Sequence, residues 1–350
     1  MAKIDVEFGK LCREIKLKGR EYENKNRGVK RLQIPSYSFK HKFSDGFPAL
    51  TNKKLPFKWV IGELIWFLRG DTDIRYLKEN GISIWDKDAY NWYVKNLPKG
   101  HVHLTLDMFT KRGFGSVGKN YSAQWRNFGE QSDGRGYYKK GVDQIVALVY
   151  EMKKDIMSSR LKVNAWNPSE LDQTALPPCH SEFQIVGVPL TPEERTKYLL
   201  ENKQVKIGYN KTDEEILKIL TDNEVPEFGF ELHWNQRSVD TFLGLPFNIA
   251  SYGLLAKILE KMTGYPALGI EGTLKCVHFY DNQYEAVDEL LGRDTKKHGE
   301  SKLVISPEVV FDSETNIDQF FRELEISDFT LEGYTSDDAI KVDMLAPKEL

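Results

Sequence analysis

The chain has 350 residues, of which 40% are hydrophobic and 29% are charged, so it can bury a core of ordinary size. Its net charge is -3, which excludes a general electrostatic attraction to nucleic acid or to a membrane surface. We therefore expect no nucleic-acid partner and no membrane partner. An anionic substrate would be bound by locally clustered arginines.

The cysteines and the N-terminus indicate where the protein works. Cys12, Cys179 and Cys276 form neither a CxxC pair nor a Cys/His spacing typical of zinc, so no metal site is predicted. An odd and sparse set of cysteines indicates a reducing compartment. Residues 1–20 carry charges throughout, unlike a signal peptide, and no apolar run approaches the ~18 residues that span a bilayer. These features predict a cytoplasmic protein.

The hydrophobic pattern predicts helices and strands interspersed along the chain. Residues 1–30 predict a basic amphipathic helix followed by a polar loop, and the alternation over 33–43 predicts a strand. Apolar residues at helical spacing predict a strong helix over 57–68. A further helix is predicted over 248–263, closed by Gly264. More strands are predicted around 161–165, 183–185 and 232–234.

Two segments differ from this pattern. Residues 89–114 are polar and aromatic, and residues 189–229 contain a capping box, Thr212 to Glu215, before an apolar run. Neither segment has enough apolar residues for a core of its own. We therefore predict one mixed α/β domain over residues 1–350, with both segments as peripheral insertions.

Cys179 is the first residue that suggests chemistry. Two prolines precede it and His180 follows. A nucleophilic cysteine needs nearby cations that favour the thiolate, and Arg237 and Arg160 are the candidates. Taken alone, the motif also fits a buried structural cysteine.

Glu63 is the second such residue. Its neighbours three and four positions away on the predicted helix are Trp59, Val60, Trp66 and Phe67. Burial among them would raise the pKa of the carboxyl group, which prepares a residue for general acid–base work. The alternative is that Glu63 lies at the helix edge and reaches solvent.

Two further motifs suggest binding functions. Arg237 and Ser238 offer a guanidinium group and a hydroxyl group to a phosphate. The amide of Asn248 can present one donor and one acceptor to a ring edge, or it can cap the following helix. His278 and Tyr280 alternate on a predicted strand and face the same side, where they either reach a sugar hydroxyl or belong to the core.

Taken in order, these motifs resemble the thymidylate synthase family. The resemblance covers residues 45–334, apart from the two insertions. It implies a single domain with a large mixed β-sheet flanked by helices, which dimerises through the sheet. The matching segments are 46–54, 63–68, 84–86, 121–126, 165–168, 176–180, 236–238 with Asp240, and 244–252.

The resemblance implies transfer of a one-carbon unit from 5,10-methylenetetrahydrofolate to dUMP, giving dTMP and dihydrofolate. Cys179 would add to C6 of the uracil ring. Arg237 would favour the thiolate and contact the phosphate together with Ser238 and Arg27, and Arg160 would reach the phosphate from the partner of a homodimer. Catalytic roles are implied for Cys179, Glu63, Tyr121, His180, Arg237 and Asp240.

The remaining site residues are also implied by the resemblance. Asn248 would pair with the uracil edge, with Gln236 in the same substrate site. His278 and Tyr280 would bind the 3′-hydroxyl group. Glu63 would organise water and relay protons in a network with Tyr121 and His180. The residues implied to contact the folate are Trp85, Leu176, Asp240 and Phe247.

The sequence departs from the family pattern at four places. Ser159 replaces the usual arginine beside Arg160, Asp88 replaces a tryptophan, and Cys276 replaces an aspartate. The tail after Tyr334 lacks its usual proline-containing segment and ends in Pro-Lys-Glu-Leu. Changes in the folate wall and the tail bear on whether hydride or water reaches the exocyclic methylene intermediate.

Three functions are therefore compared. Methylation of dUMP comes first, because the core motifs are so close to the family pattern. The alternative is a dUMP hydroxymethylase that gives 5-hydroxymethyl-dUMP and tetrahydrofolate. The third is a catalytically silent relative that binds nucleotide or RNA. Retention of Cys179, Glu63, Tyr121, Asn248 and Asp240 argues against the third function, since binding alone needs neither a nucleophile nor a base.

Overall fold

The computed structural model describes residues 2–24, 29–132, 138–202, 211–312 and 315–343, together with residues 136, 205 and 208. Arg27 and the Pro-Lys-Glu-Leu end lie outside the described residues. Among the residues that are described, no helix is long and apolar enough to cross a membrane.

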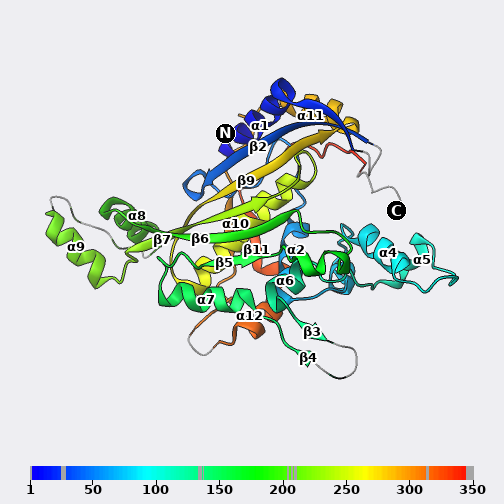
Figure 1. The fold of residues 1–350 in the computed structure, drawn as a ribbon. Helices are drawn as coiled ribbons and strands as arrows, with labels where there is room; N and C mark the ends of the chain where they lie inside the picture. Colours follow the sequence, from blue (N-terminus) through cyan, green and yellow to red (C-terminus); the bar gives the residue numbers. More distant parts are fainter. Residues whose placement is uncertain are drawn as a thin grey trace.

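A seven-stranded mixed sheet forms the centre of the molecule (Figure 1). Strands β7 and β8 run parallel to β9, and the other neighbours are antiparallel. The order along the sheet is β1 (Arg20–Asn24), β2 (Val29–Lys42), β9 (Ala267–Tyr280), β7 (Phe228–Gln236), β6 (His180–Pro189) and β5 (Lys162–Asn164), with β8 (Val239–Asp240) beside β9.

The predicted polar loop after the first helix is wrong in part, because residues 20–24 form strand β1. This short polar strand pairs along its length with β2, so the backbone hydrogen bonds of β2 stabilise a segment that has no apolar alternation of its own. The strands predicted at 33–43, 161–165, 183–185 and 232–234 are present as parts of β2, β5, β6 and β7.

Helix α10 (Gly244–Thr263) crosses from β8 to the parallel strand β9, a connection that parallel strands require. Gly264 ends the helix with a left-handed φ of 79°, as predicted. The helix begins at Gly244, earlier than the predicted start at residue 248. Asn248 therefore lies inside the helix and does not cap it.

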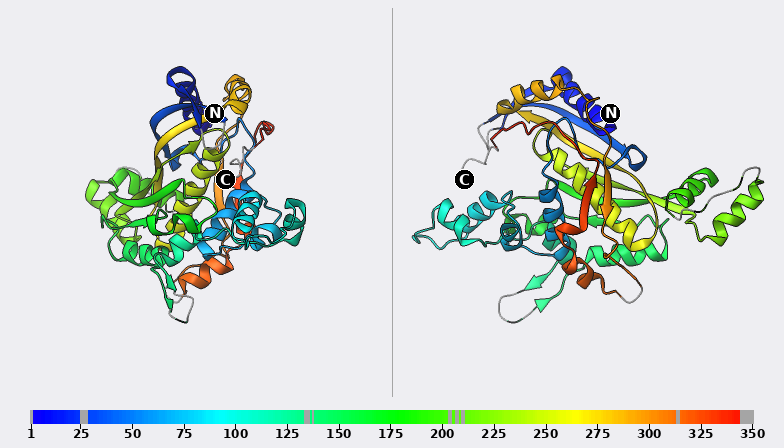
Figure 2. Two further views of the ribbon diagram at one scale, coloured as in Figure 1. Left: turned by 45° about the vertical axis from the view of Figure 1, so that its right-hand side comes forward. Right: turned by 180° about the vertical axis from the view of Figure 1, so that it is seen from behind.

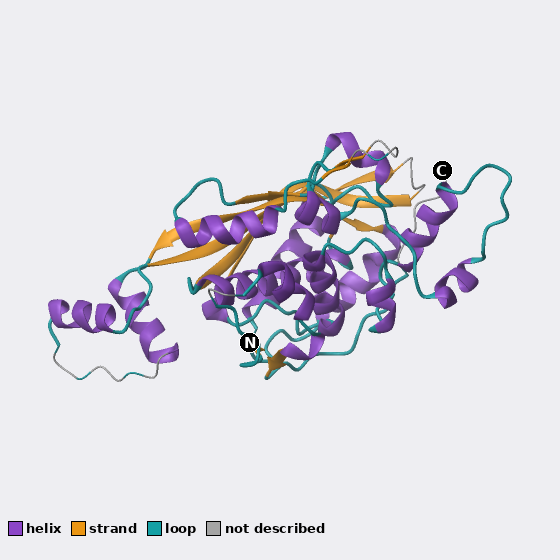
Figure 3. Ribbon diagram, turned by 90° about the horizontal axis from the view of Figure 1, so that it is seen from below, coloured by secondary structure: helices purple, strands orange, loops and turns teal. Residues whose placement is uncertain are grey.

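Most helices lie on one side of the sheet (Figures 2 and 3). Helix α2 (Phe57–Arg69) is the predicted strong helix, and its Val60, Leu64 and Leu68 are fully buried. The other main-body helices are α1 (Lys3–Lys18), α3 (Arg75–Glu79), α6 (Tyr121–Asn127), α7 (Gln144–Lys154), α11 (Tyr284–Gly292) and α12 (Ile317–Glu323). Two small ribbons complete this body: β3 (Gln131–Ser132) with β4 (Tyr138–Lys139), and β10 (Lys302–Ile305) with β11 (Phe329–Glu332).

The two segments predicted as insertions project from this body (Figure 1). Segment 189–229 contains α8 (Pro192–Asn202) and α9 (Asp213–Asp222), and Thr212 forms the predicted capping box with Glu215. Segment 89–114 contains most of α4 (Asp86–Lys95) and all of α5 (Leu106–Arg112). The α8–α9 projection has its own small apolar cluster of Leu199, Leu220 and Val225.

Leu220→Ala should unfold the α8–α9 projection locally without lowering the main unfolding transition. Replacing a buried leucine with alanine costs about 2–5 kcal/mol, and the small cluster has little other apolar burial to offset that loss. Amide hydrogen exchange should therefore accelerate in α8 and α9 alone. The control Leu64→Ala, in the main core, should lower the main transition; an equal lowering by both variants would contradict a peripheral insertion.

Candidate active site

The pairing of β6 with β7 brings Cys179 beside Arg237. His180 pairs with Gln236 at the ends of these strands, and a β-bulge follows between His180 and Glu182. The Arg237 backbone N–H donates to the Cys179 carbonyl at 2.8 Å. The Arg237 side chain donates from Nε to the Pro178 carbonyl at 2.7 Å. The guanidinium group of Arg237 therefore lies against the backbone of Pro178, the residue that precedes Cys179.

Tyr121 reaches Cys179 from helix α6. The Cys179 backbone N–H donates to the Tyr121 hydroxyl oxygen at 2.7 Å. Because that oxygen accepts a hydrogen bond from the backbone, the hydroxyl proton is directed elsewhere and can be donated to another group. Burial raises the pKa of Tyr121 well above its ordinary value, so the hydroxyl stays protonated at neutral pH.

His180 is held as a neutral ring. Burial lowers its pKa to about 3. Its ring stacks on Tyr121 with centroids 4.2 Å apart, and its Nδ1 lies 3.0 Å from the Tyr252 hydroxyl oxygen. Because a buried hydroxyl group needs a hydrogen-bond acceptor, we infer that the Tyr252 hydroxyl donates to His180 Nδ1. The proton of the neutral ring is then on Nε2. Tyr252 was not singled out from sequence, although it lies one helical turn from Asn248.

Glu63 is partly buried, and its carboxyl group points toward Trp85. The Trp85 indole N–H donates to Glu63 Oε1 at 2.8 Å. Burial raises the pKa of Glu63 to about 7, so it can hold or release a proton near neutral pH. The ring centroids of Trp85 and Tyr121 are 6.4 Å apart. One aromatic wall therefore links the Glu63 carboxyl group to the Tyr121–Cys179 contact.

The predicted base-binding amides meet between β7 and α10. Gln236 Nε2 donates to Asn248 Oδ1 at 3.0 Å and to the Ser238 carbonyl at 3.3 Å. Ser238 and Asn248 are both partly exposed, whereas Gln236 is buried. Gln236 is therefore placed to orient the Asn248 amide.

Asp240 and the His278–Tyr280 pair lie next to one another, because β8 pairs with β9 and aligns Asp240 with His278. The rings of His278 and Tyr280 are 4.8 Å apart, and both residues are buried. Asp240 Oδ1 accepts from Gln283 Nε2 at 3.1 Å. Burial raises the pKa of Asp240 above its ordinary value.

Lys53 is a charged residue near the site, and no role was predicted for it from the sequence. Its ammonium group donates to the Phe242 carbonyl and lies 3.9 Å from the centre of the Phe242 ring. Burial lowers its pKa to about 8, while the negative charge of Asp240 opposes that shift. Lys53 lies within the matched segment 46–54, which could have marked it as a site residue. Its contact with Phe242 could not be predicted, because it depends on the fold.

The other predicted site residues have less defined contacts. Arg160 is exposed in the turn before β5. Leu176 lies partly buried in the loop before Cys179, and Phe247 lies partly buried in the first turn of α10. Cys276, one of the four departures, has a positive φ of 46°, and its carbonyl lies 2.7 Å from His278 Nδ1. The backbone at Cys276, and not its thiol, holds His278.

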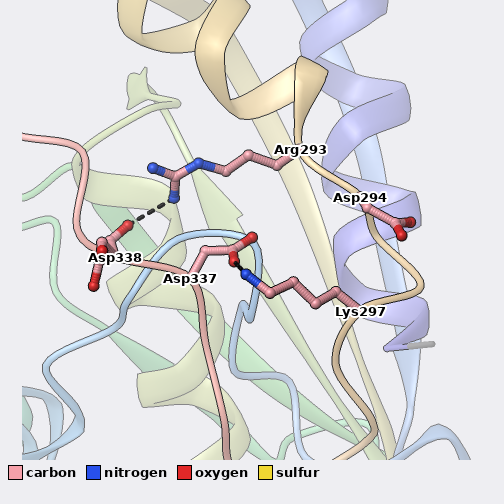
Figure 4. A pocket seen from close by; sticks show the side chains of 5 residues that line it. All are labelled: Arg293, Asp294, Lys297, Asp337 and Asp338. Carbon is pink, nitrogen blue, oxygen red and sulfur yellow. Dashed lines mark hydrogen bonds and ion pairs between the residues drawn. The ribbon is translucent and has the colours of Figure 1, made fainter.

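The C-terminal tail is anchored by polar contacts in place of prolines. The Tyr334 hydroxyl donates to the Leu50 carbonyl at 2.7 Å, and the Asp337 backbone N–H donates to the Thr51 carbonyl at 2.8 Å. The Asp337 carboxylate pairs with Lys297 and His298. A charged pocket of about 270 Å³ lies there, lined by Arg293, Asp294, Lys297, Asp337 and Asp338 (Figure 4).

These contacts bring together groups of the kinds that covalent catalysis by a cysteine uses. The thiol is partly exposed, a guanidinium group is fixed beside its segment, and a tyrosine hydroxyl group contacts its backbone. An ionisable carboxyl group lies along the same wall. A nucleophile, a stabilising cation and an acid–base group are the parts that covalent catalysis needs.

Comparison with known proteins gives the family. Residues 6–346 match the sequence profile of the family described as thymidylate synthase. The chain is 34% identical over 310 residues to the thymidylate synthase of Malacoplasma penetrans, covering 86% of each chain. It is 31% identical over 344 residues to that of Listeria innocua, covering 90% of this chain and 91% of the relative. It is 32% identical to that of Aster yellows witches'-broom phytoplasma, covering 95% and 97%.

The chain therefore belongs to the thymidylate synthase family. The match confirms the predicted fold class and the predicted reaction: a methyltransferase that converts dUMP to dTMP with methylenetetrahydrofolate as co-substrate. The hydroxymethylase alternative is not favoured.

Glu63→Gln should make the protein more stable at pH 8 but not at pH 4. Below the ordinary pKa of 4.5, the carboxyl group is protonated in both folded and unfolded states and contributes no pH dependence. As the pH rises from 4.5 through about 7, the unfolded state ionises first, so wild-type stability falls. Glutamine removes this loss. Thermal unfolding of both proteins from pH 4 to pH 8 measures it; a constant difference would contradict the raised pKa.

Proposed function

We propose that methylation of dUMP takes place at Cys179. The observation that carries the proposal is the contact set around that residue, with Arg237 on one side and Tyr121 on the other. The Cys179 sulfur forms a bond to C6 of the uracil ring, and the C5–C6 double-bond electrons move toward C5 and the O4 carbonyl. C5 then bonds to the folate methylene carbon and later loses its proton. The bond from the methylene carbon to the folate nitrogen breaks, which leaves an exocyclic methylene group on C5. Hydride from the folate then reduces this group to a methyl group as the sulfur–carbon bond breaks, which releases dTMP and dihydrofolate.

The proton steps fall to three groups with different charge states. The Glu63 carboxyl group, with a pKa near 7, accepts and returns protons at neutral pH. Tyr121 keeps its hydroxyl proton and stands nearest to the cysteine backbone. His180 remains neutral, with its Nδ1 beside the Tyr252 hydroxyl group. Asp240, Trp85, Leu176 and Phe247 contact the folate.

The phosphate is bound by Arg237 and Ser238 of one copy, together with Arg27, which lies outside the described residues. Arg237 now donates to two proline carbonyls, and a phosphate with two negative charges would compete for those donors. Arg160 is exposed, which suits a residue that completes the site of a second copy. His278 and Tyr280 bind the sugar hydroxyl group, and Asn248 pairs with the base.

We infer a homodimer formed through the outer face of the sheet. Most of the described helices lie against the opposite face (Figure 3). Its side chains are already ordered by ion pairs, such as Lys40 with Glu271 at 2.8 Å and Lys162 with Glu182 at 2.6 Å. A reducing, cytoplasmic compartment is also proposed, and the three free cysteines support it.

The proposal is tested by incubating the purified protein with dUMP and methylenetetrahydrofolate and weighing the products. We expect dTMP and dihydrofolate in equal amounts. Hydroxymethyl-dUMP with tetrahydrofolate would show that water, and not hydride, reaches the intermediate. Bound dUMP without any product would indicate a silent relative.

Cys179→Ala should abolish dTMP formation while dUMP binding stays measurable, because the phosphate, sugar and base contacts come from other residues. The matched control is Cys12→Ala. Burial raises the pKa of Cys12 to about 12, so that thiol is unreactive, and its loss should lower stability but not turnover. Turnover by Cys179→Ala at more than about one thousandth of the wild-type rate would remove Cys179 from its role.

A further inference from the structure

Trp234 contacts the base-binding amides from inside the core, and neither the motifs nor the catalytic residues account for it. It lies two residues before Gln236 on β7, so both side chains point to the same inner face of the sheet. Trp234 is 1% exposed, and its indole Nε1 lies 3.2 Å from Gln236 Oε1. Gln236 in turn donates to Asn248 at 3.0 Å.

The indole N–H is a donor only, and this fixes the Gln236 amide. A flipped amide would place its NH2 group against the indole N–H, and both buried donors would lose their partner. With Oε1 toward Trp234, the two N–H groups of Gln236 reach Asn248 Oδ1 and the Ser238 carbonyl. Every polar position of the Gln236 amide is then used, in one orientation.

The indole itself cannot turn away. Its ring stacks on Tyr252 with centroids 5.0 Å apart at an interplanar angle of 17°. Phe39 packs against it at 6.3 Å. Aromatic pairs of this kind hold a buried ring in place at close packing density. Trp234 therefore acts as a fixed donor at the start of a chain of two amides.

We propose that Trp234 sets the base specificity of the site by fixing the orientation of Gln236 and, through it, of Asn248. The inference rests on the proposed pairing of Asn248 with the pyrimidine edge. Uracil presents an N3–H donor and an O4 acceptor, whereas cytosine presents an N3 acceptor and an amino donor. An asparagine amide free to rotate by half a turn would match either ring. An amide held in one orientation matches uracil and opposes cytosine.

Trp234→Phe tests this role, because phenylalanine keeps an aromatic ring and removes the donor. We measure the inhibition constant of dCMP and the dissociation constant of dUMP, and take their ratio. Discrimination against dCMP should fall about fivefold, the effect of one net hydrogen bond. A general loss of stability would weaken the binding of both nucleotides and leave the ratio of the two constants unchanged.

Trp66→Phe is the matched control. Its buried indole N–H donates to the Asp73 carbonyl at 2.9 Å, away from the base-binding amides. This variant should lose stability and keep the wild-type ratio.

Trp234→benzothienylalanine, in which sulfur replaces the indole N–H, keeps the ring shape and decides the question if Trp234→Phe does not fold. A ratio within about twofold of wild type in this variant would overturn the proposal, since the loss of one hydrogen bond is larger. Wild-type protein that fails to bind dUMP would instead overturn the pairing of Asn248 with the base, and this inference with it.

Discussion

The antiparallel pairing of β6 with β7 is the constraint on which the rest of the site depends. It places Cys179, which follows Pro177 and Pro178, opposite Arg237, which follows Gln236, so the two residues meet where the paired strands end. A shift of one residue in this register would turn the inward side chains of either strand to the other face. The bulge at Ser181 ends the regular pairing just where the nucleophile begins.

Burial then gives the site its charge pattern. It keeps His180 neutral, keeps Tyr121 protonated and brings Glu63 close to its titration point near neutral pH. Arg237 is consequently the fixed positive charge beside the Cys179 segment. Arg237 itself is exposed, so the low-dielectric setting acts mainly on the hydrogen bonds of the buried Tyr121 and His180. Substrate binding would order the same groups without changing most of their charges.

The sequence predicted those features that depend on local pattern or on short contiguous motifs. The helix that carries Glu63 was predicted from apolar residues spaced at the 3.6-residue helical period. Cys179 was singled out from the prolines before it and the histidine after it. Strand β1 could not be predicted, because its polar residues form a strand only by pairing with β2. The contacts of Lys53 with Phe242 and of Trp234 with Gln236 were missed for a related reason. They depend on which side of a strand or loop faces the core once the chain has folded.

The two projecting segments and the tail lie around the candidate site without forming its Cys179–Arg237 contact. The α8–α9 projection extends from the far ends of β6 and β7, so it can differ without disturbing the register at Cys179. The tail keeps its position through Tyr334 and Asp337, although it lacks the expected prolines. Hydrogen bonds to the Leu50 and Thr51 carbonyls, with the Asp337–Lys297 ion pair, therefore hold this part of the tail.

The identity of the nucleophile is the central claim, and trapping the covalent intermediate tests it most directly. Turnover with dUMP and methylenetetrahydrofolate is quenched by rapid denaturation, and the tryptic peptides are weighed. We predict that the nucleotide mass appears on the peptide of residues 163–195, which contains Cys179 and no internal trypsin site. Nucleotide on a peptide containing Cys12 or Cys276, in place of that peptide, would contradict the assignment.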